Sequence, residues 1–394
     1  MENVSLDAII QTDNIHPLSQ KRLDTNEIHN SILHIKKTLS EYELQLLQLQ
    51  KKIASTEKTV KVIKKEHFKV IEKYEVINQT RLDIISRQEK MLRLYRVSHM
   101  IKKLFWPKIG VLYQYKPRLF TTPKRYKKNT QLAHVPTVSI VTPSFNQGDF
   151  LEKTIKSIID QKYPSIEYII QDSASKDGTI EIIHRYKDFL THWESIKDKG
   201  QSNAINLGFR HTSGEIMAYL NSDDILLPGT LHYVADYFNK HPEIDVVYGH
   251  RILINEDDHE IGRWILPRHN SDVLTWADYI PQETLFWRRR IWDKVDGKID
   301  ESFKFAMDWD LLLRFKDAGA KFARLPRFLG AFRIHIHQKT SAKIASMGAK
   351  EMERLRMRCH GRKITPIEIK KNIILYLMEH VVLHKLYKLG IMRY

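Results

Sequence analysis

From residue 137 to residue 248, short apolar runs alternate with segments in which apolar residues recur at every third or fourth position. The apolar runs have the length of buried β-strands, and the intervening segments have the length of amphipathic helices. The predicted strands are 138–141, 166–171, 193–196, 215–220 and 245–248, and the predicted helices are 150–160, 179–189, 201–210 and 231–239. This alternation predicts an α/β fold, with a mostly parallel, twisted sheet and flanking helices on both of its faces.

Polar side chains follow most of these strands at the point where each strand ends. They are Thr142, Ser144 and Asn146 after the first strand, Asp172 after the second, Asp198 after the third, and Asp223 and Asp224 after the fourth. Each of them alone could be a helix cap or a turn former. Because ligands of such sheets bind beyond the carboxyl ends of the strands, their shared position favours a binding site there.

Two adjacent carboxylates at one strand end, Asp223 and Asp224, suit a hard divalent cation. Mg²⁺ and Mn²⁺ take oxygen ligands, often one or two carboxylates together with substrate phosphates. We therefore expect a Mg²⁺ or Mn²⁺ cofactor that neutralises charge on a phosphate leaving group. The sequence has neither a glycine-rich P-loop nor a GxGxxG motif, so a nucleotide would not be held as it is in ATPases or dinucleotide-binding enzymes.

Three segments at consistent spacing carry a family resemblance. They read SIVTPSFNQGDFLEKTIKSIIDQKYPSIEYIIQDSASKDGT, DKGQSNAINLGFRHTSGEIMAYLNSDD and MDWDLLLRF. Together they resemble the family-2 glycosyltransferases, which have the nucleotide-diphospho-sugar transferase (GT-A) fold, over roughly residues 136–340. The resemblance implies inverting transfer of a sugar from a nucleotide-sugar, expected to be uridine-linked, to an acceptor hydroxyl in a surface polysaccharide or lipid-linked glycan.

The resemblance also implies roles for the residues at the strand ends. Thr142, Ser144 and Asn146 would line the pocket for the base and ribose, Asp172 would contact the base, and Asp198 would close over the nucleotide. The stretch Asn221–Asp224 occupies the place of the metal-binding aspartate motif, with Asn221 where many relatives have aspartate. Asp223 would then be the main metal ligand at the donor, with Asp224 assisting. His335 would be a third ligand, although a single histidine is more often structural.

Asp308, in the segment MDWD, matches the catalytic carboxylate of the family. A base must take the proton from the acceptor hydroxyl as its oxygen attacks the anomeric carbon. Relatives have an acidic residue before this position, where this chain has Met307, so Asp310 is an alternative base. Either carboxylate could instead cap the start of a helix.

The segment from Ile280 to Arg289 resembles the part of the family that frames the acceptor. Its candidate acceptor residues are Gln282, Glu283 and Trp287, and Trp287 could either stack on a sugar ring or lie in the interior. The stretch from Arg333 to Lys339 resembles the closing loop whose basic residues meet the diphosphate.

Residues 27–98 carry mostly apolar residues at the a and d positions of a heptad repeat, with no glycine or proline between Pro17 and Pro107. The d positions turn polar after Tyr74, at Arg81 and Gln88. Such a repeat predicts a left-handed coiled coil and therefore a homo-oligomer. A single long helix packed on the globular part is the alternative. Residues 1–26 have no periodicity and are expected to be flexible.

The formal net charge of +17 calls for an anionic partner or surface. Residues 97–148 contain nine Lys or Arg and no acidic residue. The connector at 99–135 could be a solvated linker, could lie on an anionic membrane, or could contact nucleic acid. The basic helical tail at 343–394 could pack on the domain or lie on a membrane. We expect an anionic membrane surface, and not nucleic acid, as the partner.

The single cysteine, Cys359, and the lack of a secretory signal at the start of the sequence favour a cytoplasmic protein, peripheral on the inner face of the membrane. The transferase domain is predicted at 136–342. Two alternatives stay open. A coiled-coil scaffold with a degenerate transferase domain is favoured by Asn221 and Met307. A nucleotidyltransferase would normally carry a glycine-rich, basic loop where this chain has PSFNQGDF.

Overall fold

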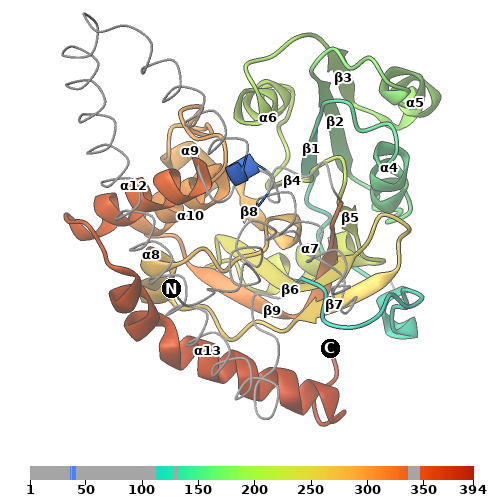
Figure 1. Cartoon of the computed structure of the whole chain (residues 1–394). Coiled ribbons are helices and arrows are strands. Elements are labelled where there is room, and N and C mark those ends of the chain that lie inside the picture. Colours follow the sequence, from blue (N-terminus) through green and yellow to red (C-terminus); the bar gives the residue numbers. More distant parts are fainter. Residues whose placement is uncertain (1–35, 37, 41–111, 128–130, 336–346) are drawn as a thin grey trace, which may run out of the picture. The chain divides into compact units, whose positions relative to one another are not determined.

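The computed structural model of the chain describes residues 36, 38–40, 112–127, 131–335 and 347–394. The chain divides into two compact units, residues 1–109 and residues 110–394. In the first unit the described residues, 36 and 38–40, are helical. The predicted flexible N-terminus and nearly all of the predicted coiled coil lie outside the described residues. The labelled helices and strands of Figure 1 belong to the second unit.

One half of the sheet consists of parallel strands. They are β1 (Val138–Ser144), β2 (Ile166–Asp172), β3 (His192–Ser195) and β4 (Ile216–Tyr219), in the order β3-β2-β1-β4, and the helices between them are α4 (Leu151–Ile159), α5 (Thr179–Tyr186) and α6 (Gln201–Phe209). Strand β1 is buried along its whole length. Ile155 of α4 packs in the apolar cluster on one face, and Phe209 of α6 packs in the cluster on the other. This half has the helix-covered, parallel arrangement that the alternation predicts.

The other half of the nine-stranded sheet is mixed. Its strands are β5 (Ile225–Leu226), β6 (Val246–Ile254), β7 (Glu260–Trp264), β8 (Phe286–Arg288) and β9 (Phe322–Arg333). Strand β8 is antiparallel to β4 and β6, while β9 is parallel to β6 and antiparallel to β5. Strands β6 and β7 form a hairpin, and strands joined by a short turn must run antiparallel. The sheet is therefore mixed, and the mostly parallel sheet expected from the sequence extends only as far as β4.

The remaining helices surround the mixed half (Figure 1). They are α7 (Thr230–Lys240), α8 (Ser271–Trp276), α9 (Arg289–Lys294), α10 (Met307–Asp317), α12 (Ala349–His360) and α13 (Pro366–Lys388). Helix α13 begins with a capping box formed by Thr365 and Glu368. None of the helices among the described residues has both the length and the hydrophobicity that are needed to cross a bilayer.

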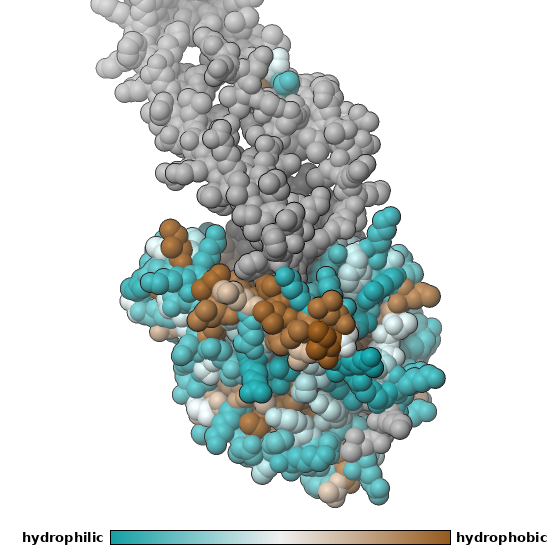
Figure 2. Space-filling view, turned by 90° about the horizontal axis from the view of Figure 1, so that it is seen from below, coloured by the Kyte–Doolittle hydropathy of each residue, from teal (hydrophilic) through white to brown (hydrophobic). Residues whose placement is uncertain are grey.

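Helix α13 packs on the domain with one face and exposes apolar residues on another. Tyr376 is buried, with its ring centroid 4.6 Å from that of Tyr279. The exposed apolar residues of the helix are Ile367, Ile374, Leu375, Met378 and Val382. Figure 2 shows apolar side chains gathered in a band on the side of the unit where α13 lies. A helix that is apolar on both sides needs a second covering surface.

Part of the predicted connector packs on the mixed half. Arg118 forms an antiparallel bridge with Glu260 at the start of β7. Tyr126 is buried, and its hydroxyl accepts a hydrogen bond from the backbone N–H of Phe328 at 3.0 Å. The described residues at 112–127 are therefore tied to the same unit as the sheet.

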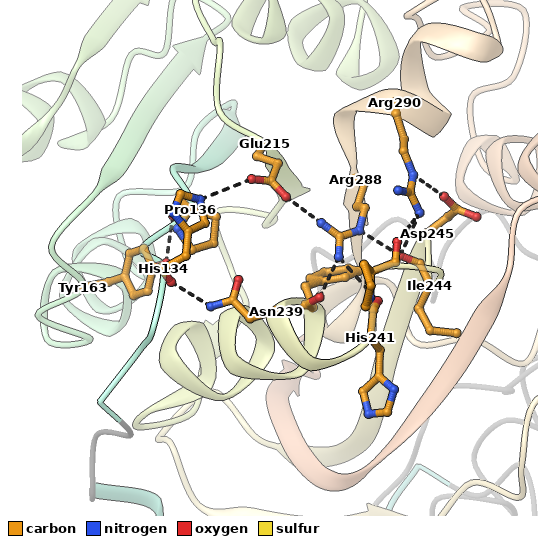
Figure 3. Close-up of polar contacts among 12 residues, drawn as sticks. His134, Pro136, Tyr163, Glu215, Asn239, His241, Ile244, Asp245, Arg288 and Arg290 are labelled. Atoms are coloured by element: carbon orange, nitrogen blue, oxygen red, sulfur yellow. Dashed lines mark hydrogen bonds and ion pairs between the residues drawn. The ribbon is translucent and has the colours of Figure 1, made fainter.

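A polar network closes the edge at which β4 begins (Figure 3). Arg288 donates to the carbonyl of Ile244 at 2.9 Å and to the Glu215 carboxylate at 2.5 Å. Asn239 donates to the backbone carbonyl of His134 at 2.7 Å. These contacts fix the antiparallel strand β8 beside β4, and the opposite, carboxyl edge of the parallel strands is left for the candidate site.

Candidate active site

A cavity of about 1050 Å³ lies at the carboxyl ends of β1 and β4. Its volume is that of a site for a small molecule or cofactor, and its position follows the rule for ligand sites in α/β sheets. Five of the predicted site residues line it: Ser144, Asp198, Asp223, Gln282 and Asp308. Seven others do not: Thr142, Asn146, Asp172, Asp224, Glu283, Trp287 and His335.

Three of the residues outside the lining hold the strands and loops beneath the cavity. The Thr142 hydroxyl is buried in β1, 3.2 Å from the Tyr168 hydroxyl. The buried Asp172 carboxylate accepts hydrogen bonds from the Ser175 backbone N–H at 2.9 Å and from the Ser175 hydroxyl at 2.5 Å. Asn146, in the left-handed region with a φ of 50°, accepts from the backbone of the same β2–α5 loop. They shape the walls around the predicted nucleotide position.

Asn221 is fixed by a network of side-chain amides. Its Oδ1 accepts a hydrogen bond from Gln201 Nε2 at 2.6 Å, and its Nδ2 donates to Gln282 Oε1 at 3.0 Å. Gln282 in turn donates to the Tyr219 carbonyl at 2.7 Å. An amide both donates and accepts, whereas an ionised carboxylate only accepts. The asparagine therefore suits this position better than the aspartate of many relatives.

Asp223 lines the cavity and pairs with the buried His335, which does not line it. Asp223 Oδ2 and His335 Nε2 lie 3.0 Å apart. The His335 ring lies 4.7 Å from the Phe150 ring, and its Nδ1 is buried without a hydrogen-bond partner among the described residues. His337 and Lys339 of the predicted closing loop lie outside the described residues.

Asp224 is buried and does not line the cavity. Its Oδ1 accepts a hydrogen bond from the Arg333 backbone N–H at 3.0 Å, and its Oδ2 lies 3.4 Å from Asn221 Nδ2. Burial, then the neighbouring carboxylates of Asp223 and Glu283, raise the pKa of Asp224 well above its usual value. The structure thus presents only one of the two adjacent carboxylates, Asp223, to a ligand.

The residues present could supply some of the ligands of a metal ion, with the remaining ligands coming from the substrate and water, but they do not form a complete ligand set. Among the residues that the structure describes, no cluster of three or more His, Cys, Asp or Glu side chains could hold a metal. One carboxylate and one imidazole, from Asp223 and His335, are ligands that Mn²⁺ accepts. Divalent ions at such sites take further ligands from substrate phosphates and water.

Asp308 supplies a carboxylate at the start of α10. Its Oδ1 accepts the backbone N–H of Trp309 at 2.8 Å, and burial raises its pKa to about 6. The alternative base, Asp310, is buried in ion pairs with Arg314 at 2.8 Å and Arg358 at 2.5 Å, and it does not line the cavity. Of the two aspartates in the MDWD segment, Asp308 alone faces the cavity.

The predicted acceptor residues fall in different places. Gln282 lines the cavity, but Glu283 is buried and pairs with Arg251 through two contacts of 2.8 Å and 2.5 Å. Trp287 is fully buried in the core, with its ring centroid 5.8 Å from that of Phe209. It therefore presents no face to a sugar ring.

Two lining residues that sequence reasoning missed are Arg251 and Asp278. Arg251 is held by Glu283, and its guanidinium lies 4.4 Å from the centre of the Phe332 ring. Enclosure by protein and the nearby Asp308 raise the pKa of Asp278 well above its usual value. Asp278 stands just before the predicted acceptor segment, which is a signal that could have identified it.

The model of the family described as Glycosyl transferase family 2 matches residues 139–304. This segment is a glycosyl transferase family 2 domain. It contains Ser144, Asp198, Asp223 and Gln282, whereas Asp308 lies beyond the matched residues.

Curated relatives also match part of the chain. The chain is 29% identical over 198 residues to an uncharacterized glycosyltransferase of Rickettsia typhi, covering 48% of this chain and 60% of that protein. It is 28% identical over 213 residues to the chondroitin synthase of Escherichia coli, covering 53% of this chain and 30% of that protein. It is 38% identical over 92 residues to a putative teichuronic acid biosynthesis glycosyltransferase of Bacillus subtilis, covering 23% of this chain and 36% of that protein. The chain thus spans less than two thirds of each of these relatives.

Two solved structures are also similar. S. aureus TarS 1–349 in complex with UDP-GlcNAc has a TM-score of 0.48 and 17% identity, covering 62% of this chain and 72% of that one. A mannosyltransferase of Pyrobaculum calidifontis in complex with GDP-Man and Mn²⁺ has a TM-score of 0.47 and 18% identity, covering 66% of this chain and 75% of that one.

Helix α12 completes the cavity from outside the matched family 2 segment. Glu351 accepts hydrogen bonds from the backbone N–H groups of Lys304, Phe305 and Ala306, each at 2.9 Å. A Cβ at Gly348 would lie 2.8 Å from the Phe305 ring, so the chain approaches this loop closely. The tail therefore holds the loop directly before Asp308. Sequence reasoning missed Glu351 because nothing near it in the sequence indicates this long-range contact.

Proposed function

We propose that the chain is an inverting, metal-dependent glycosyltransferase that moves a sugar from a uridine diphospho-sugar to an acceptor hydroxyl. The observation that carries the proposal is one cavity lined both by Asp308, a carboxylate with a pKa of about 6, and by Asp223, which pairs with His335. A base and a diphosphate site on one cavity are the two parts that this reaction needs.

The donor would lie along the ends of the parallel strands. Lys176 and Lys197 line this side and would attract the anionic diphosphate. Asp198 is held in place because its carboxylate accepts the Gly200 backbone N–H at 2.7 Å. Asp223 and His335 would hold the Mg²⁺ or Mn²⁺ ion, which when bound stabilises the negative charge of the leaving diphosphate.

Asp308 would act as the general base on the acceptor side. The acceptor oxygen forms the new bond to the anomeric carbon, the bond from that carbon to the diphosphate breaks with its electrons going to the diphosphate, and the hydroxyl proton passes to Asp308. A pKa of about 6 leaves the carboxylate ionised at neutral pH and basic enough to accept the proton. Gln282 and the paired Arg251 line the same side and would contact the acceptor.

The proposed acceptor is a surface polysaccharide or a lipid-linked glycan. The similarity to proteins named chondroitin synthase and putative teichuronic acid biosynthesis glycosyltransferase supports this class. The heptad repeat at 27–98 and the net charge of +17 support an oligomer at the cytoplasmic face of an anionic membrane. Light scattering before and after removal of residues 1–98 tests the oligomer.

A thermal-shift panel of UDP-, GDP- and dTDP-sugars, with and without Mn²⁺, tests the donor site. We expect a UDP-sugar to raise the Tm in the presence of Mn²⁺ and to release UDP on turnover. Asp223→Asn should lose the Mn²⁺-dependent shift, whereas the matched control Asp224→Asn should keep it, because Asp224 does not line the cavity. Turnover that is unchanged in excess EDTA would contradict the metal proposal. If the protein binds donors but turns over none of them, the alternative of a coiled-coil scaffold with a degenerate transferase domain would be favoured.

A further inference from the structure

A second cavity, of about 510 Å³, lies between the connector, strand β7 and the last residues of the chain. Its cationic lining residues are Arg118, Arg125, Arg263, Lys388 and Arg393. None of the side chains that line it is acidic. The cavity shares no lining residue with the candidate active site. It is therefore a separate cationic site.

Only part of this positive charge is balanced. Glu260, buried next to the cavity, pairs with Arg118 at 2.6 Å and with Arg263 at 2.6 Å, so that one carboxylate serves two guanidinium groups. Arg125, Lys388 and Arg393 have no ion-pair or hydrogen-bond partner for their side chains among the described residues. Packing around Lys388 lowers the pKa of its ammonium group. A bound anion would relieve this cost.

A neutral polar group adds to the site. His384 is buried and lines the cavity, and its Nδ1 has no hydrogen-bond partner within the described part of the chain. The hydroxyl of Tyr387, another lining residue, accepts a hydrogen bond from Arg263. The cavity thus offers both cations and an unpaired nitrogen to a ligand such as a phosphate.

Exposed apolar residues alternate with the lining residues at the end of α13. Lys388, Gly390 and Met392 line the cavity, whereas Leu389 and Ile391, between them, are 74% and 67% exposed. Both residues come directly after α13 and continue along the chain its set of exposed apolar residues. A ligand that matches both features has an anionic head next to an apolar part. Tyr115, Tyr387 and Tyr394 also line the cavity. The exposed apolar residues beside it, Leu389 and Ile391, are aliphatic, which suits an acyl boundary better than a nucleobase.

We propose that the second cavity binds the phosphate headgroup of an anionic membrane lipid, with Leu389, Ile391 and the outer face of α13 entering the interface. This placement follows the rule for interfacial helices, in which cations meet the headgroups and apolar residues lie at the acyl boundary. The site is independent of the transferase reaction, and its test needs no donor turnover.

Sedimentation of the full chain with vesicles tests the proposal. We expect binding to vesicles that contain phosphatidylglycerol and none to pure phosphatidylcholine at low salt. Arg125→Gln/Lys388→Gln/Arg393→Gln should weaken binding by roughly a hundredfold, since each cation near an anionic surface contributes about fivefold. Lys187→Gln/Arg210→Gln/Lys298→Gln removes the same charge from exposed sites away from the cavity and should weaken binding only slightly. Circular dichroism checks that both variants fold.

The other possible occupants give different results. Leu389→Ser/Ile391→Ser should weaken vesicle binding while the protein keeps its oligomeric state in light scattering. A lower oligomeric state without loss of vesicle binding would show that a second copy covers this face, and would overturn the proposal. Inorganic phosphate could instead raise the Tm of the wild type but not of the variant that lacks the three cavity cations, while neither protein binds vesicles. That result would identify a soluble phosphate compound as the ligand and would overturn the proposal. Equal binding by the cavity variant and its control would also overturn the proposal.

Discussion

The donor side and the acceptor side of the large cavity are held together in different ways. On the donor side, contacts join the carboxyl ends of neighbouring parallel strands, as between Asp172 at the end of β2 and the Ser195 hydroxyl at the end of β3, at 2.6 Å. On the acceptor side, Asp308 lies among residues from other parts of the chain, with Arg251 on β6 and Glu351 on α12. Geometry on the donor side therefore depends on the order of the sheet. Geometry on the acceptor side depends on long-range contacts and should be easier to disturb from a distance.

The two sides also differ in their polar groups. Lys176 and Lys197 line the donor side together with Asp198 and Asp223, and Asp278 and Asp308 line the acceptor side together with Arg251. Cations suit a diphosphate, and a carboxylate with a pKa of about 6 suits a base. Titration near neutral pH is thus expected from the acceptor side.

Asp308→Asn should give the largest effect. We expect turnover to fall by roughly 10²- to 10⁴-fold, because the amide cannot accept the proton, while donor affinity stays unchanged. Because the pKa of Asp308 is raised in the folded state, its ionisation costs stability above that pKa. The variant should therefore have a higher Tm than the wild type at pH 7, and the difference should disappear below about pH 4, near the pKa of the unfolded chain.

Asp310→Asn is the matched control, two positions along the same helix. It leaves Arg314 and Arg358 without their shared buried partner and should lower the Tm. Turnover per folded molecule should remain. The measurements are steady-state kinetics, calorimetry with the donor and thermal melts. Near-wild-type turnover in Asp308→Asn would remove the base assignment.

Glu351→Ala tests the long-range support of the acceptor side. The change leaves the backbone N–H groups of Lys304, Phe305 and Ala306 without their acceptor, so the loop before Asp308 should lose its fixed position. We expect kcat to fall by about tenfold with donor affinity unchanged, since a small displacement of a catalytic group is costly. Glu353→Ala, on the same helix but paired with the exposed Lys363, should keep wild-type kcat. Loss of donor affinity in Glu351→Ala would show that the two sides are not separable.

The pH dependence of kcat/KM tests the charges around Asp308. The base must be ionised, so the rate should rise with pH through a midpoint near 6. Arg251 lowers the pKa of Asp308 and Glu283 raises it. Arg251→Gln should therefore move the midpoint up and Glu283→Gln should move it down, by up to about one pH unit, and the double variant should lie between them. Midpoints that move in the same direction would exclude Asp308 as the titrating group.

The sequence predicts the parallel half of the fold well because each strand–helix pair there is a local unit. It also predicts Asp223 and Asp308 as cavity residues. Polar residues at a strand end can either face a ligand or brace a neighbouring loop, and the sequence does not distinguish the two; Asp172 is an example. The sequence could not identify Arg251 or Glu351, because their roles come from partners that only the folded chain brings together.

Asn221→Asp should have the smallest effect, and it lies where the two sides meet. The new carboxylate keeps the contact with Gln201 Nε2 but loses the hydrogen bond donated to Gln282 Oε1, and two acceptor oxygens then face each other. We expect a loss of about 1 kcal/mol in stability and a few-fold lower kcat/KM. Mn²⁺ affinity should not rise, because the side chain at 221 is engaged with two glutamines rather than directed at Asp223. Titration of Mn²⁺ against both proteins with UDP present decides the point. Tighter Mn²⁺ binding in the variant would mean that the asparagine weakens the metal site, as the degenerate scaffold requires.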